Sequence, residues 1–478
     1  MELAQALLGM ILWQEINKNM KRLLFIIVCV LIFLDAPAYA ADLCVDESGS
    51  YGDGTSWAAC LQWSAFTPTR GNDYYVGDNG GSAYAAKTFS TAASGTTVIA
   101  IYKATESSHG PTTAWDSSYG DGQAVLTSAV QFSTSYWTLN GQTRDEDNWF
   151  DDTAYGFKIN STYASQISIS GNVDDVEIYY VYLEGKDSMP AAAQNPPWYS
   201  MYFVPDWANR ISGHVVSRCF FQYSNVNIFT RMSDGMIIEY SAFLDNESNS
   251  NNHGEALSAY SGATYSSASH DFIIRYNKSR LINGTNVWAI YGSGHKIYGN
   301  VDWDGEYCTS ADGYAGFGGG AASKVEFHNV EAYNNTIIGN CGFMFDGIDE
   351  SGNIVRNNLW ITVSGDCPVG NGGSATTYSN NGFNVGSGCV GSDNQYSIPT
   401  SVFNVYASDD FTLSGTGDII DNGYTLTTDG YIDYDMLGVD RDADSGWDIG
   451  AYEYDSVNPG VLSIPGNLSI SSGSLSVH

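Results

Sequence analysis

Basic residues are scarce in this sequence. Its 478 residues include 19 lysines and arginines against 53 aspartates and glutamates, a formal net charge of −34 at pH 7. A negative field of that strength repels nucleic acids and anionic lipid surfaces, so neither is expected as a partner. It attracts cations instead, and calcium in particular prefers clustered carboxylate and carbonyl oxygens.

Several motifs of recognised chemistry are also missing. The sequence has no P-loop, no Gly-x-Ser-x-Gly, no His-Glu-x-x-His and no Cys-x-x-Cys. The sequence therefore gives no indication of a nucleotide, haem or zinc cofactor. Long helical patterns are missing after residue 41 as well. Short alternating β-branched and aromatic runs lie between turn signals there, which indicates an all-β chain.

The N-terminus carries the one apolar run of note. Residues 23–34 are apolar, follow the basic pair Lys21-Arg22 and precede the small-x-small triplet at 38–40. A run of that length is typical of a secretory signal peptide and too short to span a bilayer. We predict that residues 1–40 are a signal peptide, with Met20 as the natural start; an uncleaved membrane anchor is the alternative. The mature protein is then extracellular or at the cell surface, without membrane contact.

The rest of the chain repeats. Seven similar segments, such as "VVSRCFF", "AYNNTII" and "IVRNNLW", place an apolar pair before a small or amide residue. Those residues are Cys219, Ser241, Asn277, Asn300, Asn335, Asn358 and Asn381. Their separations are 22, 36, 23, 35, 23 and 23 residues, or one coil of about 22 with two inserted loops. This period predicts a right-handed parallel β-helix, in which each coil buries its apolar face only by stacking on its neighbours.

The recurring asparagines are interpreted as structural. At equivalent bends of stacked coils they form an internal ladder, in which each side-chain amide bonds otherwise unpaired backbone groups of the next coil. A β-sandwich is the rival fold. Its strands would not repeat at 22–23 residues with an amide in register.

Four cysteines fall in one sector of successive coils. Cys308, Cys341, Cys367 and Cys389 each lie six to nine residues after a ladder position. Stacked coils are separated by roughly 4.8 Å, which suits the Cα separation of a disulfide. We predict the pairs Cys308–Cys341 and Cys367–Cys389, with Cys341–Cys367 as the competing pair.

The two ends of the repeat read differently from its middle. Residues 41–110 are expected to form an N-terminal cap and opening coil, tied by Cys44 and Cys60. The β-helix follows over 111–455, and 456–478 form a C-terminal tail. Cys219 occupies a ladder position and is most simply a buried free thiol.

The segment "WDIGAYEY" at 447–454 carries a resemblance. With Arg441 before it, and with "YYVGDNGG" and "TTVIAIYKAT" near the N-terminus, it resembles secreted bacterial right-handed β-helix repeat proteins that carry varied surface anchors. In that group an Asp-Ile-Gly-Ala-x-Glu segment ends the last coil. The resemblance implies the β-helix fold and a closing role for this segment.

A second resemblance lies in "GEALSAYSG" and the following "FIIRYNKSRLINGTNVWAIYGSGHKIYGN". These are similar to the central coils of β-helix alginate and dermatan-sulfate lyases. The resemblance implies that Glu255 leads a strand and contributes to a calcium site that neutralises the uronate carboxylate. The family's base, a lysine, falls near Ala259 or Tyr260 and its arginine near Tyr291, and this sequence has neither basic residue there.

The candidate chemistry centres on His253 and Glu255. Two residues apart in an extended segment, both side chains can point the same way, and imidazole can transfer protons near neutral pH. His253 or Tyr260 is the proposed base. The calcium-binding hypothesis combines Glu255 with three carboxylates that alternate along the sequence and are therefore expected to face one side of a strand. The trio is Asp302, Asp304 and Glu306.

Aromatic residues are the candidate sugar-binding groups, because a flat apolar ring suits a pyranose. The expected set is Trp198, Trp207, Trp288 and Trp303, together with Tyr199. The first two lie in a Pro-rich segment of the kind that walls a groove. Internal aromatic packing is the alternative interpretation.

These observations lead to two hypotheses. The first is a secreted β-helix protein that binds an extracellular acidic polysaccharide, and in its enzymatic version cleaves it by β-elimination with calcium offsetting the substrate carboxylate. The second is a non-catalytic rod, of the adhesin or virion-fibre kind. Fold alone does not decide between them, because function lies in sites.

Overall fold

The computed structural model describes most of the chain after residue 40. The described residues are 41–47, 51–161, 165–185, 199–206, 209–247, 254–259, 268–283, 287–305, 327–339, 350–362, 367, 376–426, 432–442 and 446–454. Among them, no helix is long and apolar enough to cross a membrane.

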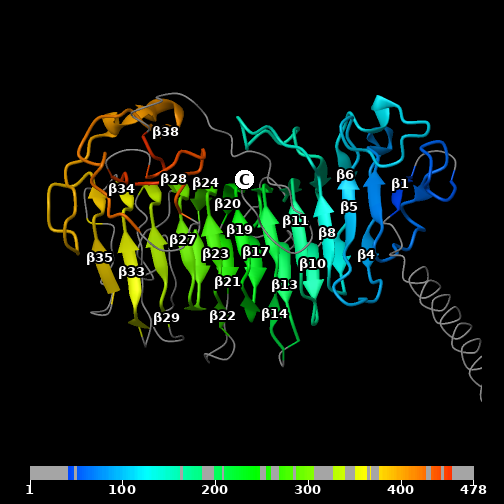
Figure 1. The fold of residues 1–478 in the computed structure, drawn as a ribbon, viewed down its shortest axis with the longest axis horizontal. Helices are drawn as coiled ribbons and strands as arrows, with labels where there is room; N and C mark the ends of the chain where they lie inside the picture. Colours follow the sequence, from blue (N-terminus) through cyan, green and yellow to red (C-terminus); the bar gives the residue numbers. More distant parts are fainter. Residues whose placement is uncertain are drawn as a thin grey trace, which may run out of the picture. The chain divides into compact units, whose positions relative to one another are not determined.

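The described strands form four long parallel sheets (Figure 1). Sheet 1 consists of β2 (Leu61–Gln62), β1 (Asp42–Asp46), β3 (Asp73–Val76), β5 (Ile99–Lys103), β8 (Trp137–Asn140), β11 (Val176–Tyr179), β15 (Val215–Ser217), β19 (Ile237–Glu239), β23 (Ile273–Arg275), β27 (Lys296–Tyr298), β30 (Glu331–Tyr333), β33 (Asn353–Arg356) and β35 (Thr376–Ser379). Sheet 2 consists of β6 (Ala124–Leu126), β9 (Phe157–Ile159), β12 (Val181–Glu184), β16 (Phe220–Gln222), β20 (Ala242–Glu247), β24 (Lys278–Asn283), β28 (Val301–Gly305), β31 (Thr336–Gly339), β34 (Leu359–Ile361) and β36 (Gly382–Phe383).

The other two sheets contain fewer described strands. Sheet 3 consists of β4 (Lys87–Phe89), β7 (Val130–Phe132), β10 (Ser165–Ser170), β13 (Tyr199–Val204), β17 (Val226–Thr230), β21 (Glu255–Ala259) and β25 (Trp288–Ile290). Sheet 4 consists of β14 (Ile211–Ser212), β18 (Ser233–Asp234), β22 (Ser269–His270), β26 (Gly292–Ser293), β29 (Phe327–His328) and β32 (Glu350–Ser351). From β11 to β26 successive strands visit sheets 1, 2, 3 and 4 in turn, and each pairs in parallel with the strand one coil further along. The chain is a right-handed parallel β-helix, as predicted.

The remaining elements are short and lie towards the two ends. The 3-10 turns are η1 (Asn79–Gly81), η2 (Ser117–Tyr119), η4 (Thr400–Val402) and η5 (Tyr406–Ser408). The strands β37 (Phe403–Val405) and β38 (Asp410–Leu413) form an antiparallel pair.

From β11 onward, the chain bends from sheet 1 to sheet 2 at the residue that directly follows each sheet 1 strand. This residue has a positive φ, for example 48° at Tyr240, 56° at Tyr276 and 49° at Asn334. Gly299 occupies the same bend at φ 66°, and a Cβ there would lie 2.5 Å from the ring of Tyr276. Glycine is therefore needed at this one coil, whereas asparagine and tyrosine hold the left-handed conformation at its neighbours.

The asparagine ladder follows this bend and is confirmed. The backbone N–H of each ladder residue donates to the side-chain oxygen of the next, at 3.0–3.1 Å. The ladder runs through Cys219, Ser241, Asn277, Asn300, Asn335, Asn358 and Asn381. One further step, to Asn394 at 3.1 Å, extends it. All seven repeat residues are buried, so the amides supply hydrogen bonds that water cannot reach.

A second internal row contains histidines. His214 and His295 are fully buried, and their Nδ1 atoms accept from the backbone N–H groups of Val176 and Phe272 at 3.3 and 3.2 Å. Asn353 plays the same part for Val330 at 2.9 Å. Burial lowers the pKa of both histidines to about 4, so each imidazole is neutral and structural.

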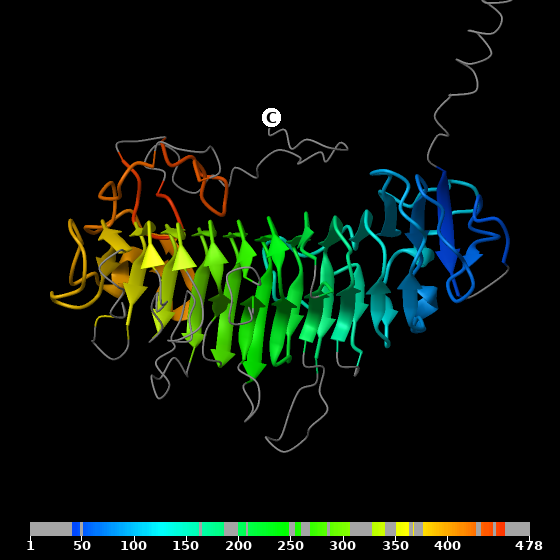
Figure 2. The same ribbon diagram turned by 90° about the horizontal axis from the view of Figure 1, so that it is seen from below.

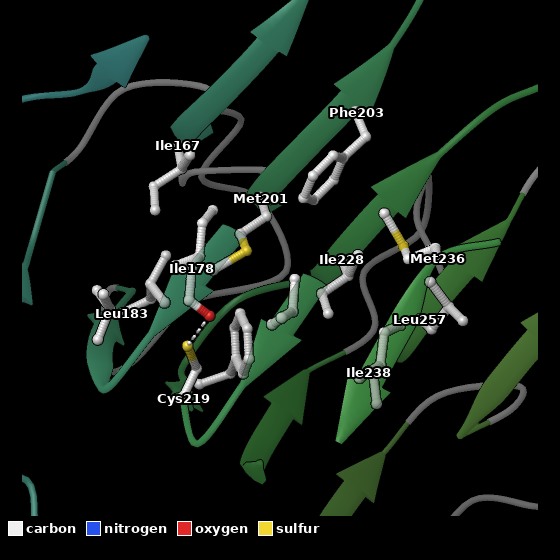
Figure 3. Close-up of a cluster of buried hydrophobic side chains, with 14 of the residues drawn as sticks. Ile167, Ile178, Leu183, Met201, Phe203, Cys219, Ile228, Met236, Ile238 and Leu257 are labelled. Atoms are coloured by element: carbon white, nitrogen blue, oxygen red, sulfur yellow. Dashed lines mark hydrogen bonds between the residues drawn. The ribbon is translucent and has the colours of Figure 1, made fainter. Parts of the chain in front are cut away.

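Stacked apolar rows fill the interior. Val130, Ile167, Met201, Ile228, Leu257 and Trp288 lie in register along the inner side of sheet 3. Figure 3 shows part of this row facing Ile178 and Ile238 of sheet 1, with the buried thiol of Cys219 donating to the Ile178 carbonyl at 3.5 Å. The prediction that Cys219 is a buried free thiol is thus confirmed.

Two of the three predicted disulfides lie within the described residues. Cys44–Cys60 and Cys367–Cys389 are both formed, with Cα separations of 5.0 and 5.3 Å. Cys308 and Cys341 lie outside the described residues.

The C-terminal segment departs from the expected closing role. Figures 1 and 2 show it, in orange and red, beside the yellow and green coils. The Ala451 N–H donates to Thr336 Oγ1 at 2.9 Å, the Gly450 N–H to the Asn357 carbonyl at 2.7 Å, and Asn334 Nδ2 to the Asp448 carbonyl at 2.9 Å. The segment "WDIGAYEY" therefore covers the outer side of coils in sheet 2 instead of ending the last one. Its Arg441 is buried and paired with Glu453 at 2.8 Å.

Candidate functional site

The candidate site lies on the outer face of sheet 3. In β13, Met201 and Phe203 point into the core, so Tyr202 between them points outward. Tyr202 is in register with Ser168 on one side and with Phe229 of β17 on the other. An outward row of partly buried polar and aromatic side chains therefore crosses neighbouring coils.

Three rings on this face form an aromatic patch. The patch consists of Tyr199, Tyr202 and Phe229. Ring centroids are 5.2 Å apart for Tyr199–Tyr202, 4.6 Å for Tyr199–Phe229 and 5.5 Å for Tyr202–Phe229, the last pair stacked. Both tyrosines are partly exposed, whereas Phe229 is buried beside them. Mutual contact fixes the rings in place, so a flat ligand meets a preformed surface.

Two opposite charges flank the aromatic patch. The Arg231 guanidinium lies over the Phe229 ring, 5.2 Å from its centroid. Glu255 begins β21 and is in register with Val226, which pairs in turn with Tyr199. Burial, with help from Tyr202 and Glu255, raises the pKa of Tyr199, and Arg231 opposes that rise. The phenol of Tyr199 thus stays protonated and is a hydrogen-bond donor.

The position of Glu255 follows from local hydrogen bonds. Its backbone carbonyl accepts from Asn246 Nδ2 at 2.8 Å, and Asn246 Oδ1 accepts from Asn227 Nδ2 at 2.8 Å. Both asparagines are buried. They hold the first residue of β21 against β17, so the sequence-based expectation that Glu255 leads a strand is confirmed.

Both proposed bases, His253 and Tyr260, lie outside the described residues, as do Glu306, Trp198 and Trp207. Of the two positions near which the resembling lyases have a lysine, Ala259 is fully buried in the core, and Tyr260 is outside the described residues.

The two described tryptophans of the expected sugar-binding set are corrected by the structure. Trp288 is fully buried in the inner row of sheet 3. Trp303 is 5% exposed and packs between Phe150 and Phe411, with centroid distances of 5.7 and 5.4 Å. Neither ring has a free face for a sugar, because internal packing uses both.

The carboxylate trio is also corrected. Asp302 lies in the inward row of sheet 2, where it accepts from Ser279 Oγ at 2.7 Å and is buried. Asp304 is exposed and pairs with Arg280 at 3.1 Å. The strand shifts register between Trp303 and Gly305, and Asp304 has a φ of 58°, so the alternation that would align the two carboxylates is broken.

These placements do not fit a shared calcium site. Glu255 belongs to sheet 3, whereas Asp302 and Asp304 belong to sheet 2 and already have protein partners. In the described part of the chain, no three His, Cys, Asp or Glu side chains gather as metal ligands.

Arg231 and Tyr202 were missed by sequence reasoning. Tyr202 lies between apolar residues in "SMYFV", and Arg231 ends the alternating segment "VNIFTR". The available signal was the alternation of residues along each strand. It shows which side chains point outward only once it is known which of them point into the core.

No family model and no curated protein matches the chain. Among solved structures, pectate lyase Pel9A is similar with a TM-score of 0.43 and 11% identity, over 87% of this chain and 97% of that one. The PL6 family alginate lyase AlyGC gives 0.36 and 11%, over 75% and 54%, and the Dettilon tailspike protein gives 0.27 and 10%, over 69% and 62%.

Proposed function

We propose that this chain is an extracellular β-helix protein that binds an acidic polysaccharide across the outer face of sheet 3. The aromatic patch carries the proposal, because two partly exposed tyrosines held by ring contacts suit the apolar face of a pyranose. The Arg231 guanidinium beside them supplies positive charge in a chain of net charge −34. A carboxylated sugar needs that charge to overcome the protein's own field.

The direction of the polymer follows from the register. Outward side chains on successive coils are separated by the strand spacing of roughly 4.8 Å. Ser168, Tyr202, Phe229 and Ser258 lie in one such row. A linear glycan that lies parallel to this row contacts one coil after another. A glycan that lies perpendicular to the row would contact the aromatic patch with one sugar and then leave it.

Cleavage by β-elimination is the enzymatic version of the proposal. His253 or Tyr260 would remove the C5 proton, and both lie close in sequence to Glu255. Whether calcium takes part is tested by adding a chelator, and the proposed binding to sheet 3 does not depend on it.

The non-catalytic alternative rests on a specific observation. The lysine position of the resembling lyases falls near Ala259 or Tyr260 and their arginine position near Tyr291, and none of these three residues is basic. A protein that binds the polymer without cutting it has the aromatic patch and no base.

The test combines binding and product formation. Residues 41–478 are titrated with a panel of uronate polymers while the ultraviolet absorbance of the unsaturated product is followed, with calcium and then with chelator. Tyr202→Ala is expected to weaken binding about tenfold, the loss of one ring contact. The control Tyr51→Ala removes an exposed ring on the N-terminal cap and is expected to change nothing.

The outcomes separate the alternatives. Weaker binding by Tyr202→Ala supports the proposed site. If the wild type also produces a rising absorbance, the protein is a lyase; if the wild type binds the polymer and the absorbance stays flat, the non-catalytic form is supported. If no acidic polymer binds, or if Tyr202→Ala binds as the wild type does, the proposed site is wrong.

A further inference from the structure

Two lysines share one outward row on sheet 2. Lys158 pairs in register with Tyr182, and the row continues through Phe220 and Ala242 to Lys278. Lys158 lies over the Tyr182 ring at 4.9 Å and forms an ion pair with Glu184 at 3.0 Å. It is an ordinary paired lysine on an aromatic ring.

Lys278 also lies on an aromatic ring, but unlike Lys158 it has no described carboxylate as an ion-pair partner. Its Nζ lies 4.3 Å from the centroid of the Trp149 indole. Its half-buried side chain forms no ion pair and no hydrogen bond with the described residues. A half-buried ammonium with an indole but no described carboxylate in contact is costly, and the amine lowers that cost by releasing its proton.

A second cation on the same indole adds to this cost. The Arg144 guanidinium lies 4.0 Å from the Trp149 centroid and already pairs with Glu146 at 2.6 Å. Burial and then Arg144 lower the pKa of Lys278 to about 8, while Glu146 and Asp410 act in the opposite direction. A substantial fraction of the amine is therefore neutral at mildly alkaline pH, with its lone pair free.

We propose that Lys278 is a nucleophilic amine that takes an aldehyde, such as the open-chain form of a reducing sugar, as an imine. The nitrogen lone pair attacks the carbonyl carbon, two protons pass from nitrogen to the former carbonyl oxygen, and one water leaves. No oxidant or reductant takes part in this step. The site lies on sheet 2 and is independent of the proposed polysaccharide face on sheet 3.

The experiment traps the adduct on the folded protein. Residues 41–478 are incubated with glycolaldehyde and cyanoborohydride from pH 6 to pH 10, and each lysine is quantified by peptide mass mapping. Lys278 is expected to be modified several-fold faster than Lys158 near pH 8, and the difference is expected to shrink as the pH approaches the ordinary lysine pKa. Lys158 is the matched control, because it lies in the same row and on a ring but is paired.

Two further measurements keep the proposal falsifiable. Lys278→Met is expected to remove the fast-reacting site and to leave the modification of Lys158 unchanged. If that variant fails to fold, the wild-type pH profile still decides, because a Lys278 that reacts only in step with Lys158 overturns the proposal. Equal rates at both lysines, or fast modification that persists in Lys278→Met, would also overturn it.

Discussion

At the residue scale, one carboxyl lies in the inward row of sheet 2. The inward row of sheet 2 runs through Phe243, Ser279, Asp302, Ile337 and Trp360. Its apolar members stack, whereas the Asp302 carboxyl has, among the described residues, a single hydrogen-bond partner, the Ser279 hydroxyl at 2.7 Å. Burial raises the pKa of Asp302 to about 7 from its usual value of 3.8.

This raised pKa predicts a pH dependence of stability. Between about pH 4 and pH 7 the native carboxyl holds a proton that the unfolded chain has lost, so the stabilisation is complete at low pH and disappears as the pH rises through 7. Asp302→Asn keeps an acceptor for Ser279 and removes the charge. We expect its free energy of unfolding at pH 8 to exceed that of the wild type by about 1–4 kcal/mol, and the gap to close at pH 4.

Urea unfolding at both pH values checks this prediction. Asp304→Asn is the control, because Asp304 is two residues away but exposed and paired with Arg280. A gap between Asp302→Asn and the wild type that is the same at pH 4 and pH 8 would show that Asp302 does not titrate as argued.

At the element scale, the bend between sheets 1 and 2 carries the stability argument. Asn300 accepts from the Asn277 N–H at 3.0 Å and donates from Nδ2 to the Ile274 carbonyl at 3.0 Å and to Asn335 Oδ1 at 2.9 Å. Alanine at this position leaves these buried groups unpaired. We expect Asn300→Ala to lower the free energy of unfolding by at least about 2 kcal/mol.

Serine is the informative comparison for this prediction. Ser241 stands in the same ladder and accepts from the Cys219 N–H through its hydroxyl at 3.1 Å. Asn300→Ser is therefore expected to lose less than Asn300→Ala in urea unfolding, and Asn404→Ala, at an exposed amide, almost nothing. Equal losses for alanine and serine would contradict the hydrogen-bond account.

Elements also show why sequence reasoning reached some features and not others. The coils, the ladder and the disulfide Cys367–Cys389 were predictable, because a regular period of 22–23 residues lays equivalent positions over one another. The bulge at Asp304 was not predictable. One residue in the left-handed conformation turns the Asp304 side chain to a different face of the strand, while the sequence still reads as a regular alternation.

The covering segment was beyond reach for another reason. Tyr276 donates its hydroxyl to the Tyr434 carbonyl, 158 positions along the chain, at 2.7 Å. Contacts of that range have no period to reveal them. Trp303 looked like a sugar platform for the same reason, since Phe411, which covers it, is remote in sequence.

At the scale of the whole molecule, charge is the dominant physical fact. A net charge of −34 raises the free energy of the compact state through self-repulsion, and salt screens that repulsion over about 10 Å at 0.1 M. Basic residues in the described part of the chain are often internally paired, as in Arg275–Glu239 and Arg441–Glu453. These buried pairs are screened little, whereas the excess surface carboxylates are screened strongly.

We therefore expect the protein to become more stable as monovalent salt is added. The Tm of residues 41–478 is measured by calorimetry from low to moderate sodium chloride, where screening acts before specific salt effects dominate, and an upward shift of several degrees is predicted. Sucrose at matched osmolality is the control, since it stabilises without screening charge. A Tm that falls with salt would mean that surface ion pairs outweigh the self-repulsion. In that case local ion pairs, such as the one between Lys158 and Glu184, would offset the repulsion among the excess carboxylates.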